Sequence, residues 1–215
     1  MSQLTFSDPR KLAEEISKRY YKQRLMVAIW GSPGSGKSTL AGSVRNELNN
    51  VHQLATEIVS MDGFHYDNAV LEKLHLRDRK GAANTFDVEG LTSLLMRLKA
   101  IPSVEIAIPI FDREQDCVKG SAFVIEKDVS IILVEGNYLL LKQSPWQKLE
   151  QYFDLTIKIN CSLKTLEQRL TQRWLDLGLS QERSLLKVHQ NDLLNAEIVE
   201  IKSNDADLKF DAESL

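Results

Sequence analysis

A lysine and a hydroxyl residue close a glycine-rich segment, GSPGSGKS, at residues 31–38. The segment satisfies the pattern G-x-x-x-x-G-K-[ST], whose glycines let successive backbone N–H groups converge on a phosphate. In this pattern Lys37 supplies charge to the β and γ phosphates, and Ser38 offers a hydroxyl to Mg²⁺. We therefore predict a nucleoside-triphosphate site whose residues are Gly31, Ser32, Pro33, Gly34, Ser35, Gly36, Lys37, Ser38 and Thr39.

An acid follows the next apolar run, in the segment VSMDGFHYDN at residues 59–68. Ligands gather at the carboxyl ends of strands in open α/β sheets, so Asp62 is expected beside the phosphate loop. A carboxylate there can take the proton of an attacking hydroxyl, organise magnesium, or do both. His65 could bind a substrate hydroxyl or phosphate, or serve only the structure. The alternative for Asp62-Gly63 is a simple hairpin turn.

Two charged segments indicate a polar substrate. LRDRKGAANTFD, at residues 76–87, contains Arg79, Lys80 and Asp87, and PIFDREQD, at residues 109–116, places Asp112 and Arg113 after an expected strand. Acid and base pairs at strand ends suit an acceptor that carries hydroxyl groups. The first segment could equally be a solvated charged loop.

A second acid and two arginines complete the candidate chemistry. IILVEGNYLLL, at residues 131–141, is an apolar strand that ends at Glu135, where an acid can orient magnesium-bound water or substrate, and Asn137 is included as a substrate contact. Arg169 and Arg173 are four residues apart on a predicted helix, so both lie on one face, where they could form a lid over a transferring phosphoryl group. The expected catalytic residues are Asp62, Lys37, Arg173 and Glu135, and the expected magnesium ligands are Ser38, Asp62 and Glu135.

The elements that must position these residues alternate between strand and helix, which predicts an α/β domain with a mainly parallel sheet. The expected strands are 25–30, 57–61, 104–110, 130–134 and 155–159, with EIVEIK at 197–202 as a final strand. Residues 117–128 could add a short antiparallel strand or a hairpin. Helices are expected at 8–23, 162–177 and 181–195. The first is an amphipathic helix within residues 1–24, and residues 25–215 form the main body of one domain.

Composition excludes several classes of protein. The chain has 215 residues, a net charge of −3 and 43% apolar residues, which is typical of a globular protein and gives no basic surplus for nucleic-acid binding. No apolar run approaches the roughly 20 residues that span a bilayer. The two cysteines form no CxxC pair, which favours a reducing compartment, so we expect a cytoplasmic protein. We expect it to be a monomer or a homodimer.

In order along the chain, the segments GSPGSGKS, MDGFHYDN, RKGAANTFD, FDREQD, VEGNYLLL, RWLDLGLS and NDLLNA resemble those of the uridine kinase, phosphoribulokinase and bacterial-type pantothenate kinase superfamily. They are most similar to its compact nucleoside/nucleotide kinase-like branch, which includes proteins described as fructose-transport kinases. The resemblance implies a P-loop kinase fold with a five-stranded parallel core, a small helical lid, and ATP with Mg²⁺. It also implies that Phe86, Asp87, Asp112 and Arg113 contact the acceptor.

The sequence thus predicts a kinase that transfers the γ-phosphate of ATP to a hydroxyl of a nucleoside, vitamin or sugar-like compound. Two alternatives stay open. One is a nucleotide-binding regulatory or assembly protein without an acceptor, and the other is a simple ATPase. FDREQD replaces the YDxxxxxR arrangement of uridine kinases, which weakens a uridine assignment.

Overall fold

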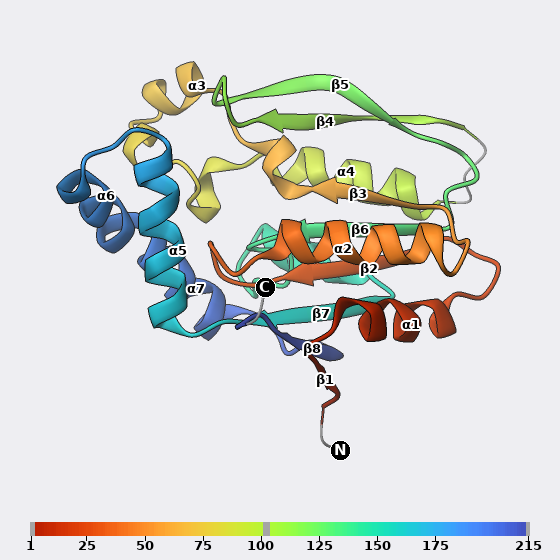
Figure 1. Cartoon of the computed structure of the whole chain (residues 1–215). Helices are drawn as coiled ribbons and strands as arrows, with labels where there is room; N and C mark the ends of the chain where they lie inside the picture. Colours follow the sequence, from red (N-terminus) through yellow and green to blue (C-terminus); the bar gives the residue numbers. More distant parts are fainter. Residues whose placement is uncertain (1–2, 101–103, 214–215) are drawn as a thin grey trace.

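The computed structural model of the chain describes residues 3–100 and 104–213. A sheet of parallel strands forms the centre, in the order β1-β8-β7-β2-β6-β3 (Figure 1). Its strands are β1 (Thr5–Phe6), β2 (Leu25–Trp30), β3 (Thr56–Ser60), β6 (Ile131–Gly136), β7 (Leu155–Asn160) and β8 (Leu208–Asp211). The predicted fold class is confirmed, although the sheet has six strands instead of five.

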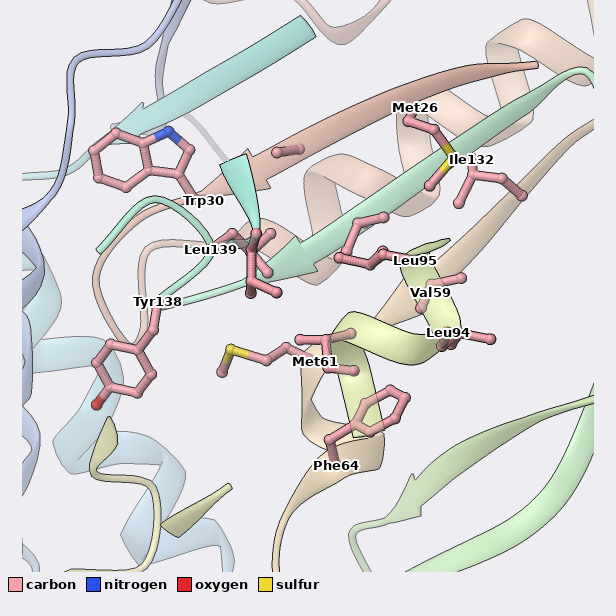
Figure 2. Close-up of a cluster of buried hydrophobic side chains, with 14 of the residues drawn as sticks. Met26, Trp30, Val59, Met61, Phe64, Leu94, Leu95, Ile132, Tyr138 and Leu139 are labelled. Atoms are coloured by element: carbon pink, nitrogen blue, oxygen red, sulfur yellow. The ribbon is translucent and has the colours of Figure 1, made fainter. Parts of the chain in front are cut away.

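The central strands are apolar because helices cover both faces of the sheet. Every residue of β2 and of β6 is buried, as expected for parallel strands between two helical layers. On one face, α1 (Pro9–Arg19) and α2 (Lys37–Asn50) pack over alternate strand residues. On the other face, α4 (Val88–Lys99) and the chain around Tyr138 and Trp146 enclose the larger core (Figure 2).

A two-stranded antiparallel sheet lies outside the main sheet. Strands β4 (Ile106–Asp112) and β5 (Cys117–Ile125) form this hairpin, and in Figure 1 it lies beyond β3. The short antiparallel strand predicted within 117–128 is therefore present as β5, and its partner is the strand that we expected in the core. The buried residues of β4, Ile106 and Ile108, alternate with more exposed ones, so β4 covers the core with one face only.

Helices α5 (Leu163–Asp176), α6 (Gln181–Lys187) and α7 (Leu193–Lys202) lie at the carboxyl end of the sheet (Figure 1). Ser162 caps α5 as predicted, because its side chain accepts a hydrogen bond from the backbone of Thr165. A π-helical segment, Val188–Asp192, joins α6 to α7 without a break. A short helix, α3 (Asn68–Lys73), follows the Asp62 region.

The prediction of a strand at residues 197–202 is wrong, because this segment belongs to α7. The segment EIVEIK contains three β-branched residues, which favour a strand, but the buried residues are Asn195, Ala196 and Val199, which share one helical face. Ile201 is 68% exposed. The first helix is also shorter than predicted, since Tyr20 ends it in an extended conformation.

Candidate active site

The phosphate loop joins β2 to α2 as the motif requires. Gly34 and Gly36 have φ angles of 77° and 94°, in a region that favours glycine, and Gly36 caps α2. A Cβ atom on Gly34 would come within 2.9 Å of Leu170 in α5. The loop therefore adopts a conformation that presents the N-terminus of α2 to an anion. Helix α5 packs directly on the loop.

Lys37 is the first residue of α2 and is only 8% exposed. Its Nζ donates a hydrogen bond of 2.9 Å to the carbonyl of Ser32, which holds the ammonium across the mouth of the loop. Burial lowers the pKa of Lys37 to about 8, although the charges of Glu135 and Asp62 act in the opposite direction. Among the described residues, no carboxylate makes a hydrogen bond to this buried cation, which suits a polyphosphate partner.

Asp62 lies in a one-turn 3₁₀ helix, Met61–Phe64, that directly follows β3. The Ser60 hydroxyl caps this turn by accepting from the backbone N–H of Asp62. Arg113, from the hairpin, donates to one oxygen of the Asp62 carboxylate at 3.0 Å. The 3₁₀ turn rules out the hairpin reading of Asp62-Gly63 and points the acid toward the phosphate loop.

Glu135 lies at the end of β6 and is 5% exposed. Burial and then the negative charge of Asp62 raise the pKa of Glu135, and the Ser60 hydroxyl donates a hydrogen bond to its carboxylate. Ser60 thus makes hydrogen bonds to the backbone of Asp62 and to the carboxylate of Glu135. The two strand ends, β3 and β6, are neighbours in the sheet, which is why these acids meet.

An aromatic group surrounds His65. Its ring centroid is 4.0 Å from that of Phe86 and 4.9 Å from that of Phe111. Its Nδ1 is 2.9 Å from the carbonyl oxygen of Asp62, so Nδ1 carries the proton, because a carbonyl only accepts. Burial lowers the pKa of His65, which favours a neutral ring.

These groups line one cavity of about 960 Å³, which is large enough for a nucleotide with a small acceptor. The phosphate loop forms one end. Its other walls come from the Asp62 turn, the hairpin and helices α5 to α7. Among the predicted residues, those that line it are Pro33, Gly34, Gly36, Lys37, Ser38, Thr39, Asp62, His65, Lys80, Phe86, Arg113, Glu135, Asn137, Arg169 and Arg173.

Arg169 and Arg173 project from α5 as the four-residue spacing predicts. Arg169 donates to the carbonyl of Ala212 at 2.9 Å and approaches the carbonyl of Ser35 in the phosphate loop at 3.5 Å. The Arg173 guanidinium lies 5.8 Å from the ring of Trp174 and makes no hydrogen bond to the described residues. Arg173 can therefore turn toward a bound phosphate without breaking a hydrogen bond to the described residues.

Several predicted residues do not line the cavity. Arg79 donates to the carbonyl of Gln190 at 2.8 Å, and Asp87 caps α4 by accepting from the backbone of Gly90. Asp112 pairs with Lys119 and accepts from the backbone of the hairpin turn. The remaining three, Gly31, Ser32 and Ser35, belong to the phosphate loop but are buried and do not line the cavity.

Sequence reasoning missed other residues that line the cavity, among them Phe111, Glu114, Asp116, Trp174, Lys187, Asp192 and Asn195. Asp116 lies within the quoted segment FDREQD, and Trp174 follows a predicted arginine, so both could have been predicted from the sequence. Asp192 and Asn195 lie within NDLLNA, one of the segments that carry the family resemblance, although no role is assigned to them there. Lys187 gave no comparable signal, because the π turn between it and Asp192 interrupts the regular helical spacing.

The side-chain oxygen atoms beside the phosphate loop are suitable ligands for magnesium. The Ser38 hydroxyl and the carboxylates of Asp62 and Glu135 are oxygen ligands, which Mg²⁺ prefers together with phosphates and water. Residues 3–100 and 104–213 contain no group of three or more His, Cys, Asp or Glu side chains placed to hold a metal.

No helix in the described part of the chain is long and apolar enough to cross a membrane.

Comparisons with known proteins agree with this geometry. The profile of the Phosphoribulokinase / Uridine kinase family matches residues 26–183. A Schizosaccharomyces pombe protein provisionally named a uridine kinase is 31% identical over 189 residues, which are 84% of this chain and 80% of that one. A Lactococcus lactis pantothenate kinase is 30% identical over 80% of this chain but only 53% of its own length. A crystal structure of a Silicibacter sp. TM1040 protein, provisionally named a fructose transport system kinase, has a TM-score of 0.88 and 37% identity, covering 94% and 98% of the two chains.

Proposed function

The chain belongs to the Phosphoribulokinase / Uridine kinase family, and we propose that it transfers the γ-phosphate of ATP to a hydroxyl of a polar small molecule, with Mg²⁺. One observation carries this proposal. The phosphate loop and the acid Asp62 line the same cavity, together with side chains from the hairpin and the lid helices. That space accommodates an acceptor next to a nucleotide.

In the proposed reaction the carboxylate of Asp62 accepts the proton of the acceptor hydroxyl. The hydroxyl oxygen then forms a bond to the γ-phosphorus while the bond to the β-phosphate oxygen breaks, which releases ADP. Lys37 and Arg173 stabilise the negative charge on the transferring group. Magnesium, when bound with the nucleotide near Ser38 and Glu135, would neutralise further charge.

Arg113 has a distinct position in this scheme. It pairs with one oxygen of Asp62 at 3.0 Å, and no hydrogen bond from the described residues reaches the other oxygen. The pair holds the acid in one orientation, which leaves its second oxygen for the acceptor hydroxyl. An acid fixed in this way is positioned before the acceptor binds.

The structure disfavours the regulatory alternative. A protein that only senses nucleotide would not need an open space between the loop and Asp62. The side chain of Asp62 is instead 26% exposed and faces the cavity. The same cavity disfavours a simple ATPase, which transfers the phosphoryl group to water and needs no binding site for a second substrate.

The test is ATP consumption by the purified protein against a panel of nucleosides, pantothenate, ribosides and hexoses, with Asp62→Asn run beside it. We expect one compound to stimulate ADP release in the wild type but not in the variant. A slow background that no compound stimulates would favour the ATPase or the regulatory reading. Phosphorylation of the stimulating compound, observed by mass spectrometry, would name the acceptor.

A further inference from the structure

The π-helical segment between α6 and α7 shapes the wall of the cavity that faces the acceptor. Its hydrogen bond runs from the backbone N–H of Leu193 to the carbonyl of Val188, five residues earlier. Positions five apart in an α-helix are separated by roughly 140° around the axis. The extra residue of the π turn brings Lys187 and Asp192 onto one face, so both line the cavity. Asn195, three residues further on, joins them.

Asn195 is 1% exposed, and its amide orientation is fixed by a chain of hydrogen bonds. The Nδ2 group of Asn191 donates to the carbonyl of Lys80 at 3.2 Å, so the Oδ1 atom of Asn191 is the one left to accept. The Nδ2 group of Asn195 donates to that atom at 3.4 Å. The Oδ1 atom of Asn195 is buried without a hydrogen-bond donor among the described residues.

Asp192, which is 8% exposed, is in a similar situation. The indole Nε1 of Trp174 donates to its Oδ2 atom at 2.7 Å, and no second donor from residues 3–100 or 104–213 contacts the carboxylate. A buried acceptor without a donor is unfavourable, so native structures rarely leave one unmatched. The buried Oδ1 atom of Asn195 is such an acceptor, and the Oδ1 atom of Asp192 receives no hydrogen bond from the described residues. Because both residues line one cavity, these atoms point to a ligand that supplies the donors.

The cations on this side of the cavity already have acidic neighbours. Arg77 and Lys80 both pair with Asp116, at 3.0 Å and 2.7 Å. Arg113 pairs with Asp62, and the Lys187 ammonium lies 5.0 Å from the ring of Trp174, where its charge acts on Asp192. Arg173 and Lys187 make no ion pair with the described residues, but the charges of both act on Asp192. A carboxylate on the acceptor would therefore compete with Asp192 for these two cations.

We propose that Asp192 and Asn195 form a hydrogen-bond-accepting subsite that selects an uncharged acceptor with at least two donor groups, such as a nucleoside, sugar or polyol. This inference rests on the proposed function, since it specifies the acceptor of the same reaction. The aromatic side chains of His65, Phe86 and Phe111 also line the cavity and can contact apolar faces of such a compound. A carboxylate such as pantothenate is disfavoured.

The experiment measures binding rather than turnover. Calorimetric titrations with uridine, D-ribose, D-fructose, ribitol and pantothenate would be run on the full chain with Mg²⁺ and a non-hydrolysable ATP analogue. We expect at least one neutral probe to bind more tightly than pantothenate. Asn195→Leu should weaken that probe roughly tenfold, because one buried hydrogen bond is lost.

Asp192→Asn is the second variant. It keeps an oxygen for Trp174 but replaces the other with an NH₂ donor, so binding of the neutral probe should fall while binding of pantothenate rises. A merely structural role would not reverse the preference. Ser184→Ala is the matched control, because the Ser184 hydroxyl is also buried without a partner but does not line the cavity. We expect this control to bind like the wild type.

Tighter binding of pantothenate than of every neutral probe would overturn the proposal, as would no binding of any neutral probe. Equal affinities in the wild type and in both variants would also overturn it. Failure of the proposed function looks different, since a neutral probe would then bind in an Asn195-dependent way but would not be phosphorylated with ATP.

Discussion

The two ends of the cavity are built in different ways. The phosphate end consists of consecutive residues, 31–39, and its conformation comes from glycines at positive φ and from the N-terminus of α2. The acceptor end collects side chains from the Asp62 turn, the 77–81 loop, the hairpin and three C-terminal helices. Local sequence thus builds the first, and tertiary packing builds the second.

The electrostatics of the two ends differ as well. At the phosphate end Lys37 is buried and Arg173 makes no hydrogen bond within the described chain, so positive charge is left for the ligand. At the acceptor end each of Arg77, Lys80 and Arg113 has an acid within 3.0 Å. This contrast supports the proposal that the first end binds an anion and the second a neutral compound.

Lys37→Met should have the largest effect, because it removes the buried charge at the phosphate end but keeps the volume of the side chain. We expect ATP turnover to fall at least a thousandfold, as loss of a preorganised charge from the transferring group costs several kcal/mol. Steady-state kinetics would measure the loss. An unchanged thermal unfolding curve would show that the fold is retained, and turnover within tenfold of the wild type would contradict the assignment of Lys37.

Asp62→Asn tests the boundary between the two ends. Phosphate transfer should fall by about two to four orders of magnitude, because the amide cannot take the proton of the acceptor. ATP binding should be nearly unchanged, since Asp62 lies beyond the phosphate loop. A stopped-flow assay would separate the two steps, with Asp87→Asn as a matched control outside the cavity. A near-wild-type rate of transfer would exclude Asp62 as the base.

The affinity for ATP should depend on pH through Lys37, whose pKa burial lowers to about 8. Only the ammonium form attracts phosphate, so affinity should be greatest below pH 8 and fall as the pH rises through it. The decrease approaches tenfold per unit, or roughly thirtyfold between pH 7.5 and 9.5. Equilibrium titration would measure this, and Lys37→Arg, which stays charged, should flatten the curve. A wild-type affinity that does not change with pH would contradict the prediction.

Glu200→Gln should give the smallest effect, at the point where the phosphate loop contacts α7. The Ser32 hydroxyl donates to Glu200 at 3.0 Å, and Lys158 donates to its other oxygen at 2.6 Å. Weakening this contact should raise KM for ATP by a few-fold with little change in kcat. Glu197→Gln, on the exposed part of the same helix, is the control. A larger loss in kcat than in KM would instead place Glu200 in the transfer step.

The phosphate site could be predicted from the sequence because its residues are contiguous and their conformations are local. The positions of Asp62 and Glu135 were also accessible, since acids at the ends of neighbouring parallel strands meet at one edge of a sheet. The central strands were equally readable, because burial on both faces makes them continuously apolar.

Only the tertiary structure decided which charged residues face the cavity. Arg79, Asp87 and Asp112 look equivalent to Arg113 in the sequence, but their hydrogen bonds hold them in a loop contact, a helix cap and a hairpin turn. Asp192 and Asn195 reach the cavity because one π turn rotates their helix. Sequence patterns report local backbone and burial, whereas the direction of a polar side chain depends on partners that are far away in the chain.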